Sequence, residues 1–201
     1  MNKNDIASFN TRRKILEVAR KKFQNKGFSD TSLQEIVGEI GLTRGAFYHH
    51  YKRKEDILFD LIKEIQIEIA KYIEKKAIEK SDPWEQLVTG CVAFVEKAMD
   101  KDIMKILLID APAIIPWDEW KKIDIQNSES HLKEQLKNLQ LKGLIKKIKI
   151  DYLTSFISGG LNEMAVSISH KNDFNLSKVE FTVRLMLEGL RNNGQENKRL
   201  L

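Results

Sequence analysis

Four residues of the types that recognise nucleic acid lie within one short stretch of the sequence. Arg44 carries a guanidinium fork, and Gly45 would let a ligand approach the backbone closely. Tyr48 and His49 add rings that donate or accept hydrogen bonds. Helical spacing puts all four on the side of a helix opposite Phe47, where solvent is expected. A cation and polar rings on an exposed helix face suit the base edges of a DNA major groove, so this stretch predicts DNA binding.

Two short helices joined by a tight turn at Gly41 are expected to position these residues. The first helix has a predicted buried face, with apolar residues at i, i+3, i+4 and i+7: Leu33, Ile36, Val37 and Ile40. Thr31 or Ser32 is its expected N-cap. Gln34 or Glu35, about three residues later, would complete a capping box. A glycine then supplies the left-handed residue at which such a helix ends.

The second helix is expected to begin at Thr43, with Phe47 and Tyr51 at i and i+4 on its buried side. A preceding helix over about residues 11–26 would complete a three-helix unit, and residues 1–10 would form a disordered or loosely helical arm. A helix, a glycine turn and a short polar and aromatic helix make up the helix-turn-helix pattern. Its second helix enters the major groove of DNA.

Positive charge is concentrated in the same part of the chain. Residues 1–54 contain twelve Lys and Arg against five Asp and Glu, a net charge of +7, whereas the remaining residues have a net charge of −2. This distribution suits a module that binds phosphates. Lys54 begins the next expected helix, where free N–H groups and the helix dipole already favour an anion. Lys21, Lys22 and Lys26 fit a solvated helix face equally well.

A family resemblance rests on the run GLTRGAFYHHYKRKEDIL, which follows TRRKILEVARKKFQNKGFSDTSLQEIV. These segments resemble the DNA-binding headpiece of the TetR family (TetR/AcrR-like) of bacterial transcriptional regulators. The resemblance implies a headpiece at residues 1–54, completed by the start of the next helix, and a helical ligand-binding and dimerisation domain at residues 55–201. By position in the family motif, the implied phosphate contacts are Thr31, Tyr48 and Lys54, and the implied base contacts are Arg44, Gly45 and His49.

The resemblance also implies how such a protein works. A homodimer would present two recognition helices to a pseudo-palindromic operator on double-stranded DNA, act as a repressor, and be released by a small-molecule effector. The last two helices of each subunit would form the dimer interface. The residues expected there are Phe156, Gly160, Glu163, Val179, Val183, Met186, Leu187 and Leu190.

Helical periodicity continues through the rest of the chain without a strand pattern of consequence, so the predicted fold class is all-α. Further helices are expected over about residues 54–79, 84–99, 102–108, 117–141, 151–169 and 176–191. Their expected start signals are Asp82 with Pro83, Asp102, and Ser177 with Glu180. Gly159 and Gly160 fall inside one of these helices, where each glycine destabilises the helix by about 1 kcal/mol relative to alanine. We therefore expect the last helix to approach them closely.

An effector pocket is expected among the large side chains of the core domain, although most of these are needed for packing alone. The candidates are Cys91, Phe94, Met104, Leu108, Trp117, Trp120, Phe156 and Asn162. Asn162 and Glu163, close to the paired glycines, would orient a ligand or satisfy one another across a dimer. The sequence names no effector, and it predicts no cofactor and no metal site.

Two other classes of protein compete with a regulator. An enzyme is disfavoured because phosphate-loop, Gly-x-Ser-x-Gly and HExxH motifs are absent and the four histidines lack metal-ligand spacing. The alternative is a helical protein-interaction or membrane-surface module without sequence-specific DNA binding. In AKYIEKKAIEK, however, acids alternate with lysines, which favours a solvated face. One cysteine, no N-terminal apolar segment and no run of about 20 apolar residues predict a cytoplasmic protein with no membrane partner.

Overall fold

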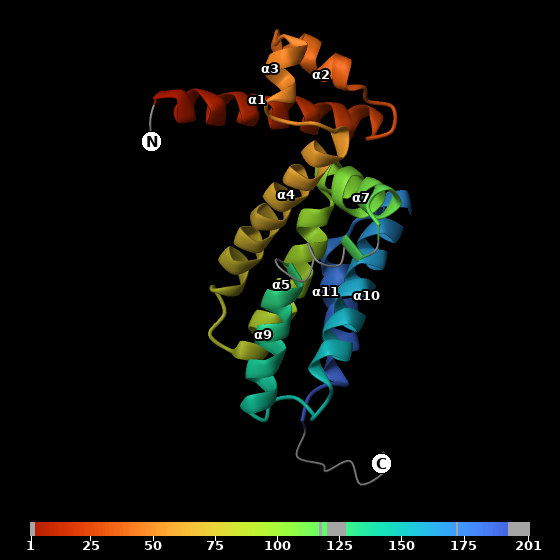
Figure 1. The fold of residues 1–201 in the computed structure, drawn as a ribbon. Helices are drawn as coiled ribbons and strands as arrows, with labels where there is room; N and C mark the ends of the chain where they lie inside the picture. The colour runs from red at the N-terminus through yellow and green to blue at the C-terminus, as the bar shows by residue number, and fades with distance from the viewer. Residues whose placement is uncertain (1–2, 117, 120–127, 172, 193–201) are drawn as a thin grey trace. The chain divides into compact units, whose positions relative to one another are not determined.

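The computed structural model of this protein describes residues 3–116, 118–119, 128–171 and 173–192 (Figure 1). Its elements, in chain order, are α1 (Lys3–Lys26), α2 (Leu33–Ile40), α3 (Arg44–Tyr48), α4 (Lys54–Ala77), α5 (Pro83–Ala98), α6 (Lys101–Ile103), the π-helix η1 (Met104–Asp110), α7 (Ala111–Ile114), α9 (Ser128–Leu141), α10 (Ile150–Lys171) and α11 (Leu176–Glu188). Across these described ranges, the one extended pairing is an isolated bridge between Ile145 and Arg191. The predicted all-α fold class is confirmed.

The contacts within the chain divide it into two compact units. The first unit contains residues 1–68 and 98–123, and the second contains residues 69–97 and 124–201. The first unit is therefore not continuous in sequence, because the segment from Ala98 onward returns to the helices that precede it. This grouping differs from the sequence-based boundary at residue 54, which stays a prediction for the functional domains.

Local signals in the sequence build the helix-turn-helix of the first unit. The Ser32 hydroxyl accepts the Glu35 N–H at 3.2 Å, while the Glu35 carboxylate accepts the Ser32 N–H at 2.8 Å, so the capping box at the start of α2 is complete. Gly41 ends α2 with φ 72°, in the left-handed region that glycine adopts without strain. Thr43 then caps α3 by accepting the Ala46 N–H at 3.2 Å. Both predicted helix starts are confirmed.

A single apolar core supports these helices. The buried residues that α1, the helix-turn-helix and the first half of α4 contribute to it are Ile15, Leu16, Ala19, Phe23, Phe28, Ile36, Phe47, Tyr51, Ile57, Leu58, Leu61, Ile62 and Ile65. The rings of Phe23 and Phe28 pack in this core with their centroids 5.3 Å apart. Of the apolar stripe predicted on α2, Ile36 alone is buried. The helix therefore meets the core along a narrower seam than predicted.

The start of α1 and the capping residue of α11 differ from the predictions, whereas α11 begins at Leu176 as predicted. The Thr11 hydroxyl donates to the Ala7 carbonyl at 3.0 Å, so Thr11 lies inside α1 rather than at its N-cap, and the helix begins at Lys3. At α11, Asn175 accepts the Lys178 N–H at 3.0 Å, so the expected capping box of Ser177 and Glu180 is wrong.

The segment after α5 is more irregular than the single short helix predicted for it. It begins as α6, changes to the π-helix η1 and continues as α7, with Pro112 in the first turn of α7. Asp102 does not cap a helix as predicted, because its carboxylate accepts a hydrogen bond from Arg20 Nε at 2.6 Å. A π-helix has a wider hydrogen-bond spacing that apolar periodicity does not report, and such segments are often found at functional sites.

In the second unit, Asp82 and Pro83 start α5 as predicted, with the Asp82 carboxylate accepting the Trp84 N–H at 2.7 Å. The core of this unit is apolar, and its buried residues include Trp84, Leu87, Val88, Val95, Leu136, Leu139, Ile157, Ala165, Val179, Val183 and Leu187. Two hydrogen bonds, of 2.7 and 2.9 Å, join Arg184 of α11 to Glu85 of α5. The first part of the predicted helix 117–141 lies largely outside the described residues; from Ser128 to Leu141 it is α9.

Candidate nucleic-acid interface

The outer face of α3 is open to solvent. The exposed residues on it and at its C-cap are Arg44, Gly45, Tyr48 and His49. Tyr48 retains 51% of its surface, whereas the neighbouring Phe47 is fully buried. The two rings meet edge to face with their centroids 5.8 Å apart. One ring thus anchors the helix and the other stays available to a ligand, although the DNA-contact roles themselves stay predictions.

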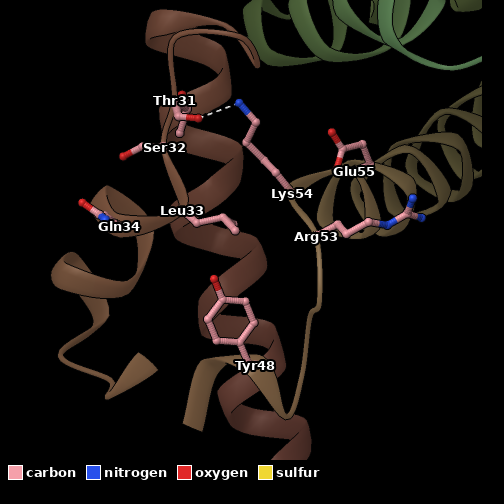
Figure 2. A pocket seen from close by; sticks show the side chains of 8 residues that line it. All are labelled: Thr31, Ser32, Leu33, Gln34, Tyr48, Arg53, Lys54 and Glu55. Carbon is pink, nitrogen blue, oxygen red and sulfur yellow. Dashed lines mark hydrogen bonds between the residues drawn. The ribbon is translucent and has the colours of Figure 1, made fainter. Parts of the chain in front are cut away.

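An open groove of about 640 Å³ lies beside Tyr48, between the start of α2 and the start of α4 (Figure 2). Its lining residues are Thr31, Ser32, Leu33, Gln34, Tyr48, Arg53, Lys54 and Glu55. The Tyr48 hydroxyl points toward Leu33 across this groove (Figure 2). The groove therefore brings together the three residues predicted as phosphate contacts, namely Thr31, Tyr48 and Lys54.

The hydroxyl of Thr31 is not available to a phosphate in this arrangement. Thr31 is 1% exposed, and its hydroxyl donates to the Gly27 carbonyl at 2.8 Å. Ser32 and Gln34 are exposed beside it and line the same groove. The sequence pattern predicts both residues only as helix caps. Their place at the N-cap and in the first turn of α2, where free backbone N–H groups favour an anion, was the available signal that they line this groove.

Lys54 also uses its polar group within the protein. Its acceptors are the carbonyl oxygens of Phe28 at 2.6 Å, Thr31 at 2.7 Å and Ser29 at 3.3 Å. Figure 2 shows the ammonium reaching toward Thr31. The predicted phosphate contact of Lys54 would have to compete with these carbonyls.

A hydrogen-bonded network of Arg12, Tyr51 and Asp60 ties the end of the helix-turn-helix to α1 and α4. The Tyr51 hydroxyl donates to Asp60 Oδ2 at 2.8 Å and accepts from Arg12 Nε at 3.0 Å. The Arg12 guanidinium also pairs directly with the Asp60 carboxylate. Burial raises the pKa of Tyr51, and its hydrogen bond to Asp60 raises it further, so the phenol stays protonated. The network fixes the chain immediately after α3.

Two further contacts tie α1 and its following loop to the segment of α6 and η1. Arg20 donates to Asp102 at 2.6 Å and to Glu68 of α4 at 2.8 Å. The Phe28 N–H donates to Asp110 Oδ2 at 2.8 Å, and Asp110 is only 9% exposed. These contacts explain why residues 98–123 belong to the same compact unit as the helix-turn-helix.

Apart from Phe156, the predicted pocket residues fall into three groups. Cys91 and Met104 are buried, and Phe94, Leu108 and Asn162 are partly exposed. Burial raises the pKa of the Cys91 thiol to about 12, so the thiol is neutral and unreactive at pH 7. Trp117 and Trp120 lie outside the described residues. The pocket itself stays a prediction.

Phe156 does not fit an internal pocket, because it is 68% exposed on the outer side of α10. It was also predicted for the dimer interface, and its exposure suits that role better. Gly160, Glu163 and Met186 of the same prediction are exposed as well.

Other residues predicted for the interface belong to the core of one chain. Val179, Val183 and Leu187 are 3%, 3% and 5% exposed, so their place in the interface is revised, and Leu190 is partly exposed. The exposed apolar residues of these two helices that were not predicted for the interface include Tyr152, Phe181 and Leu185. Helix α11 has apolar residues on two sides, and periodicity does not say which side faces the core.

The paired glycines of α10 are open within the subunit. A Cβ at Gly159 or Gly160 would meet nothing within 4 Å. The expected close approach of α11 to these glycines is therefore wrong for a single chain. Their cost to the helix has no compensation from the described residues of the subunit.

Membrane and metal sites can be assessed only for the described residues. Among these, no helix combines the length and the apolar content that crossing a bilayer requires. In the same ranges, no three His, Cys, Asp or Glu side chains are grouped so that they could hold a metal ion.

A capped two-helix turn with an exposed recognition face, carried by a larger helical chain, defines a helix-turn-helix DNA-binding protein. Residues 15–61 match the family model of bacterial regulatory proteins of the tetR family. Residues 84–190 match the model of the tetracyclin repressor-like C-terminal domain. The chain belongs to the TetR family of transcriptional regulators. This membership favours a regulator over an interaction or membrane-surface module.

Two known relatives and one solved structure illustrate how much of the chain is shared with other proteins. The TetC protein of transposon Tn10 from Escherichia coli is 26% identical over 171 residues, which cover 85% of this chain and 86% of that protein. The regulator AcrR of Shigella flexneri is 32% identical over 99 residues, 49% of this chain and 46% of that protein. Among solved structures, a TetR-family regulator from Pectobacterium atrosepticum is similar with a TM-score of 0.76 and 28% identity, over 95% of this chain and 98% of that chain.

A more distant structure shows the same fold. The regulator FadR from Bacillus subtilis, solved in complex with stearoyl-CoA, has a TM-score of 0.76 at 19% identity, over 89% of this chain and 99% of that chain. At this identity the likeness concerns the fold alone.

Proposed function

We propose that this TetR-family regulator is a repressor that binds a pseudo-palindromic operator as a homodimer and is released by a small-molecule effector. The observation that carries the DNA-reading part is the outer face of α3, where Arg44, Tyr48 and His49 are exposed beside the buried Phe47. A helix anchored on one side and polar on the other is suited to enter the major groove.

Base and phosphate contacts divide between two surfaces in this proposal. Arg44 and His49, with Gly45 allowing close approach, read base edges, and the Arg44 fork suits the O6 and N7 acceptors of a guanine. Tyr48, Ser32 and Gln34 contact phosphates from the groove. Phosphate contacts set the position of the protein on the duplex, whereas base contacts set the preferred sequence.

The dimer is proposed on the exposed sides of α10 and α11. Tyr152 and Phe156 of α10 are 69% and 68% exposed, and Phe181 and Leu185 of α11 are 68% and 64% exposed. Exposed aromatic and aliphatic residues gathered on two consecutive helices mark an interaction surface. The glycines of α10 lie on this side of the helix and leave room for a helix of a second subunit.

The effector acts through linkage. A small molecule that binds the DNA-free conformation better than the DNA-bound one weakens operator binding, and the operator weakens effector binding by the same factor. Such coupling is typically about 5- to 150-fold. Titrating candidate effectors against the operator complex, and the operator against the effector complex, measures both factors. The two factors must be equal for any true effector, because the thermodynamic cycle closes. A factor of one for every compound tested would contradict release by a small molecule.

Selection of DNA fragments from the source genome tests the proposal directly. We expect an inverted repeat whose half-sites are separated by about 34–36 Å or a multiple of that distance. Affinity for this site should fall steeply as salt rises, because phosphate contacts release counterions. Enrichment without any shared sequence, or of one half-site alone, would contradict the proposal.

Sedimentation of charge variants tests the dimer. Phe181→Glu and Leu185→Glu place a charge on the proposed interface, so each should shift the protein toward monomers. Leu141→Glu is the matched control, because Leu141 is 86% exposed at the end of α9, away from the proposed interface residues in sequence. Dimers of unchanged stability in both α11 variants would argue against this surface.

A further inference from the structure

The loop that joins α1 to α2, residues 27–32, is held by two charged side chains from distant parts of the chain. Lys54 at the start of α4 donates to three of its carbonyl oxygens. Asp110 of η1 accepts the Phe28 N–H, and the same carboxylate group is 3.0 Å from the Lys105 ammonium. A cation therefore stabilises the acceptors of the loop and an anion stabilises one of its donors.

The hydrogen-bonding capacity of Lys54 is fully used in this arrangement. An ammonium has three N–H donors, and Lys54 has three carbonyl acceptors, the most distant at 3.3 Å. Its Nζ also lies 4.2 Å from the centroid of the Phe28 ring, where a cation is attracted to the π face. A DNA phosphate could bond to this ammonium only if a loop carbonyl lost its partner.

The loop that Lys54 holds leads directly into the groove beside α3. The Thr31 carbonyl is one of the three acceptors, and Ser32, the next residue, is the N-cap of α2. Gln34 follows in the first turn of the same helix and lines the groove. Because the backbone before a helix sets the direction of its first turn, a change in the path of this loop would change where Ser32 and Gln34 point.

We propose that Lys54 is a positioning residue that holds the α1–α2 loop, and that it is not a phosphate ligand. This inference rests on the proposed DNA-binding function and deepens it. The charge of Lys54 serves the carbonyls of the protein, and its contribution to affinity passes through the orientation of Ser32 and Gln34. Neutralisation of DNA phosphates falls to other groups.

Hydrogen exchange in the DNA-free protein tests whether Lys54 holds the loop. Lys54→Met keeps the length of the side chain and removes the charge. Lys54→Arg keeps the charge, but a planar guanidinium does not direct its donors as a compact ammonium does. In both variants we expect amides of residues 28–35 to exchange about 10- to 100-fold faster than in the wild type, as for the loss of charged hydrogen bonds. Lys52→Met, at an exposed lysine two residues earlier, should leave these rates unchanged.

Operator affinity measured across salt concentrations separates positioning from phosphate contact. A positioning role predicts that both Lys54 variants bind about tenfold or more weakly with the salt slope of the wild type. A phosphate contact predicts that Lys54→Met lowers the slope by about 0.9. It also predicts that Lys54→Arg, which keeps a cation able to bind phosphate, stays close to wild-type affinity.

Three results would overturn the proposal: unchanged exchange in Lys54→Met, a slope lowered by about 0.9 in that variant, or wild-type affinity in Lys54→Arg. If Lys54→Met does not fold, Lys54→Arg decides by its exchange and its affinity. Failure of the proposed function is recognised separately, since it would appear as a wild-type protein with no operator preference. The exchange of the DNA-free protein still shows in that case whether Lys54 holds the loop.

Discussion

The side chains of Arg12, Tyr51 and Asp60 join α1 and α4 to the chain after α3 through a small polar network. Tyr51 is 2% exposed, so its hydroxyl depends on partners within the protein. Asp60 supplies the acceptor and Arg12 a donor. A buried hydroxyl that loses its acceptor retains the cost of its removal from water, which makes Asp60 the sensitive member of the network.

Asp60→Ala should therefore destabilise the protein by about 1–3 kcal/mol, because Tyr51 would keep a buried donor without an acceptor. Urea unfolding followed by circular dichroism measures this change. Glu17→Ala is the matched control, since it removes the exposed ion pair with Arg13 and should change stability by less than about 0.5 kcal/mol. Equal effects of the two substitutions would show that the network contributes no more than a surface pair.

Arg44→Lys should relax the choice of base at one operator position. The substitution keeps the positive charge but loses the bidentate fork, so the preferred base should lose about 1–3 kcal/mol of its advantage while the salt slope stays the same. Titration against operators changed at one position at a time measures this difference. The other operator positions, titrated in the same way, are the control, because their base preferences should stay as in the wild type. An equal loss at every position would indicate a phosphate contact instead.

At the scale of the element, the start of α2 combines a capping box with an ion pair. Glu35 accepts a hydrogen bond from the Lys26 ammonium at 2.6 Å in addition to the Ser32 N–H. These contacts, with Lys26 the largest cause, lower the pKa of Glu35 to about 2. Because the pKa in the folded state is depressed, the contribution of Glu35 to stability is present above its ordinary pKa of about 4.3 and disappears as pH falls toward 2.

Glu35→Gln tests this pH dependence, because glutamine still completes a capping box and lacks only the charge. We expect the wild type to melt at a slightly higher temperature than the variant at pH 5 to 7. The difference should close between about pH 4 and pH 2. High salt should also reduce it, since the pair is solvent-exposed. A difference that persists unchanged at pH 2 would contradict the role given to the charge.

The helix-turn-helix could be predicted because its signals are local. Ser32, Gly41 and Thr43 each act within about four residues of their own position, as capping and left-handed turns do. Signals that depend on distant partners could not be predicted. The partner of Asp102 is Arg20, and apolar periodicity does not distinguish the π-helix η1 from an α-helix.

In the candidate site, too, features set by local sequence could be predicted and features set by distant partners could not. The sequence indicated that Tyr48 is exposed and Phe47 buried, because consecutive residues of a helix point to different faces of it. It gave no sign that Thr31 would turn its hydroxyl to Gly27, or that Lys54 would meet three carbonyls, because both depend on the path of one loop. Likewise, only the packed structure shows which side of α11 is buried.

At the scale of the whole molecule, a substitution at Gly160 should affect the stability of one subunit and the stability of the proposed dimer in different ways. A Cβ at this position meets nothing within the subunit, and glycine costs a helix about 1 kcal/mol relative to alanine. Gly160→Leu should therefore leave the helix as stable or more stable, while it weakens the dimer by tenfold or more through collision with the facing helix.

Sedimentation equilibrium and thermal melting, measured on the same variant, separate these two effects. The matched control is Gly38→Leu, because a Cβ at Gly38 of α2 also meets nothing and Gly38 is not part of the proposed interface. A Gly160→Leu dimer as strong as the wild type would mean that no helix approaches α10 at this point.

The discontinuous first unit limits how the DNA specificity of this regulator can be transplanted. A chimaera made by cutting after α4 would leave Arg20 without Asp102, and the Phe28 N–H without Asp110. Grafting the reading helices onto another sensor would require residues 98–116 to travel with them. Circular dichroism of a fragment ending at residue 79 should show helix melting well below the temperature of the full chain. Exchange of DNA-binding units between such regulators thus depends on the later segment that packs against the first helices, and not only on where those helices end.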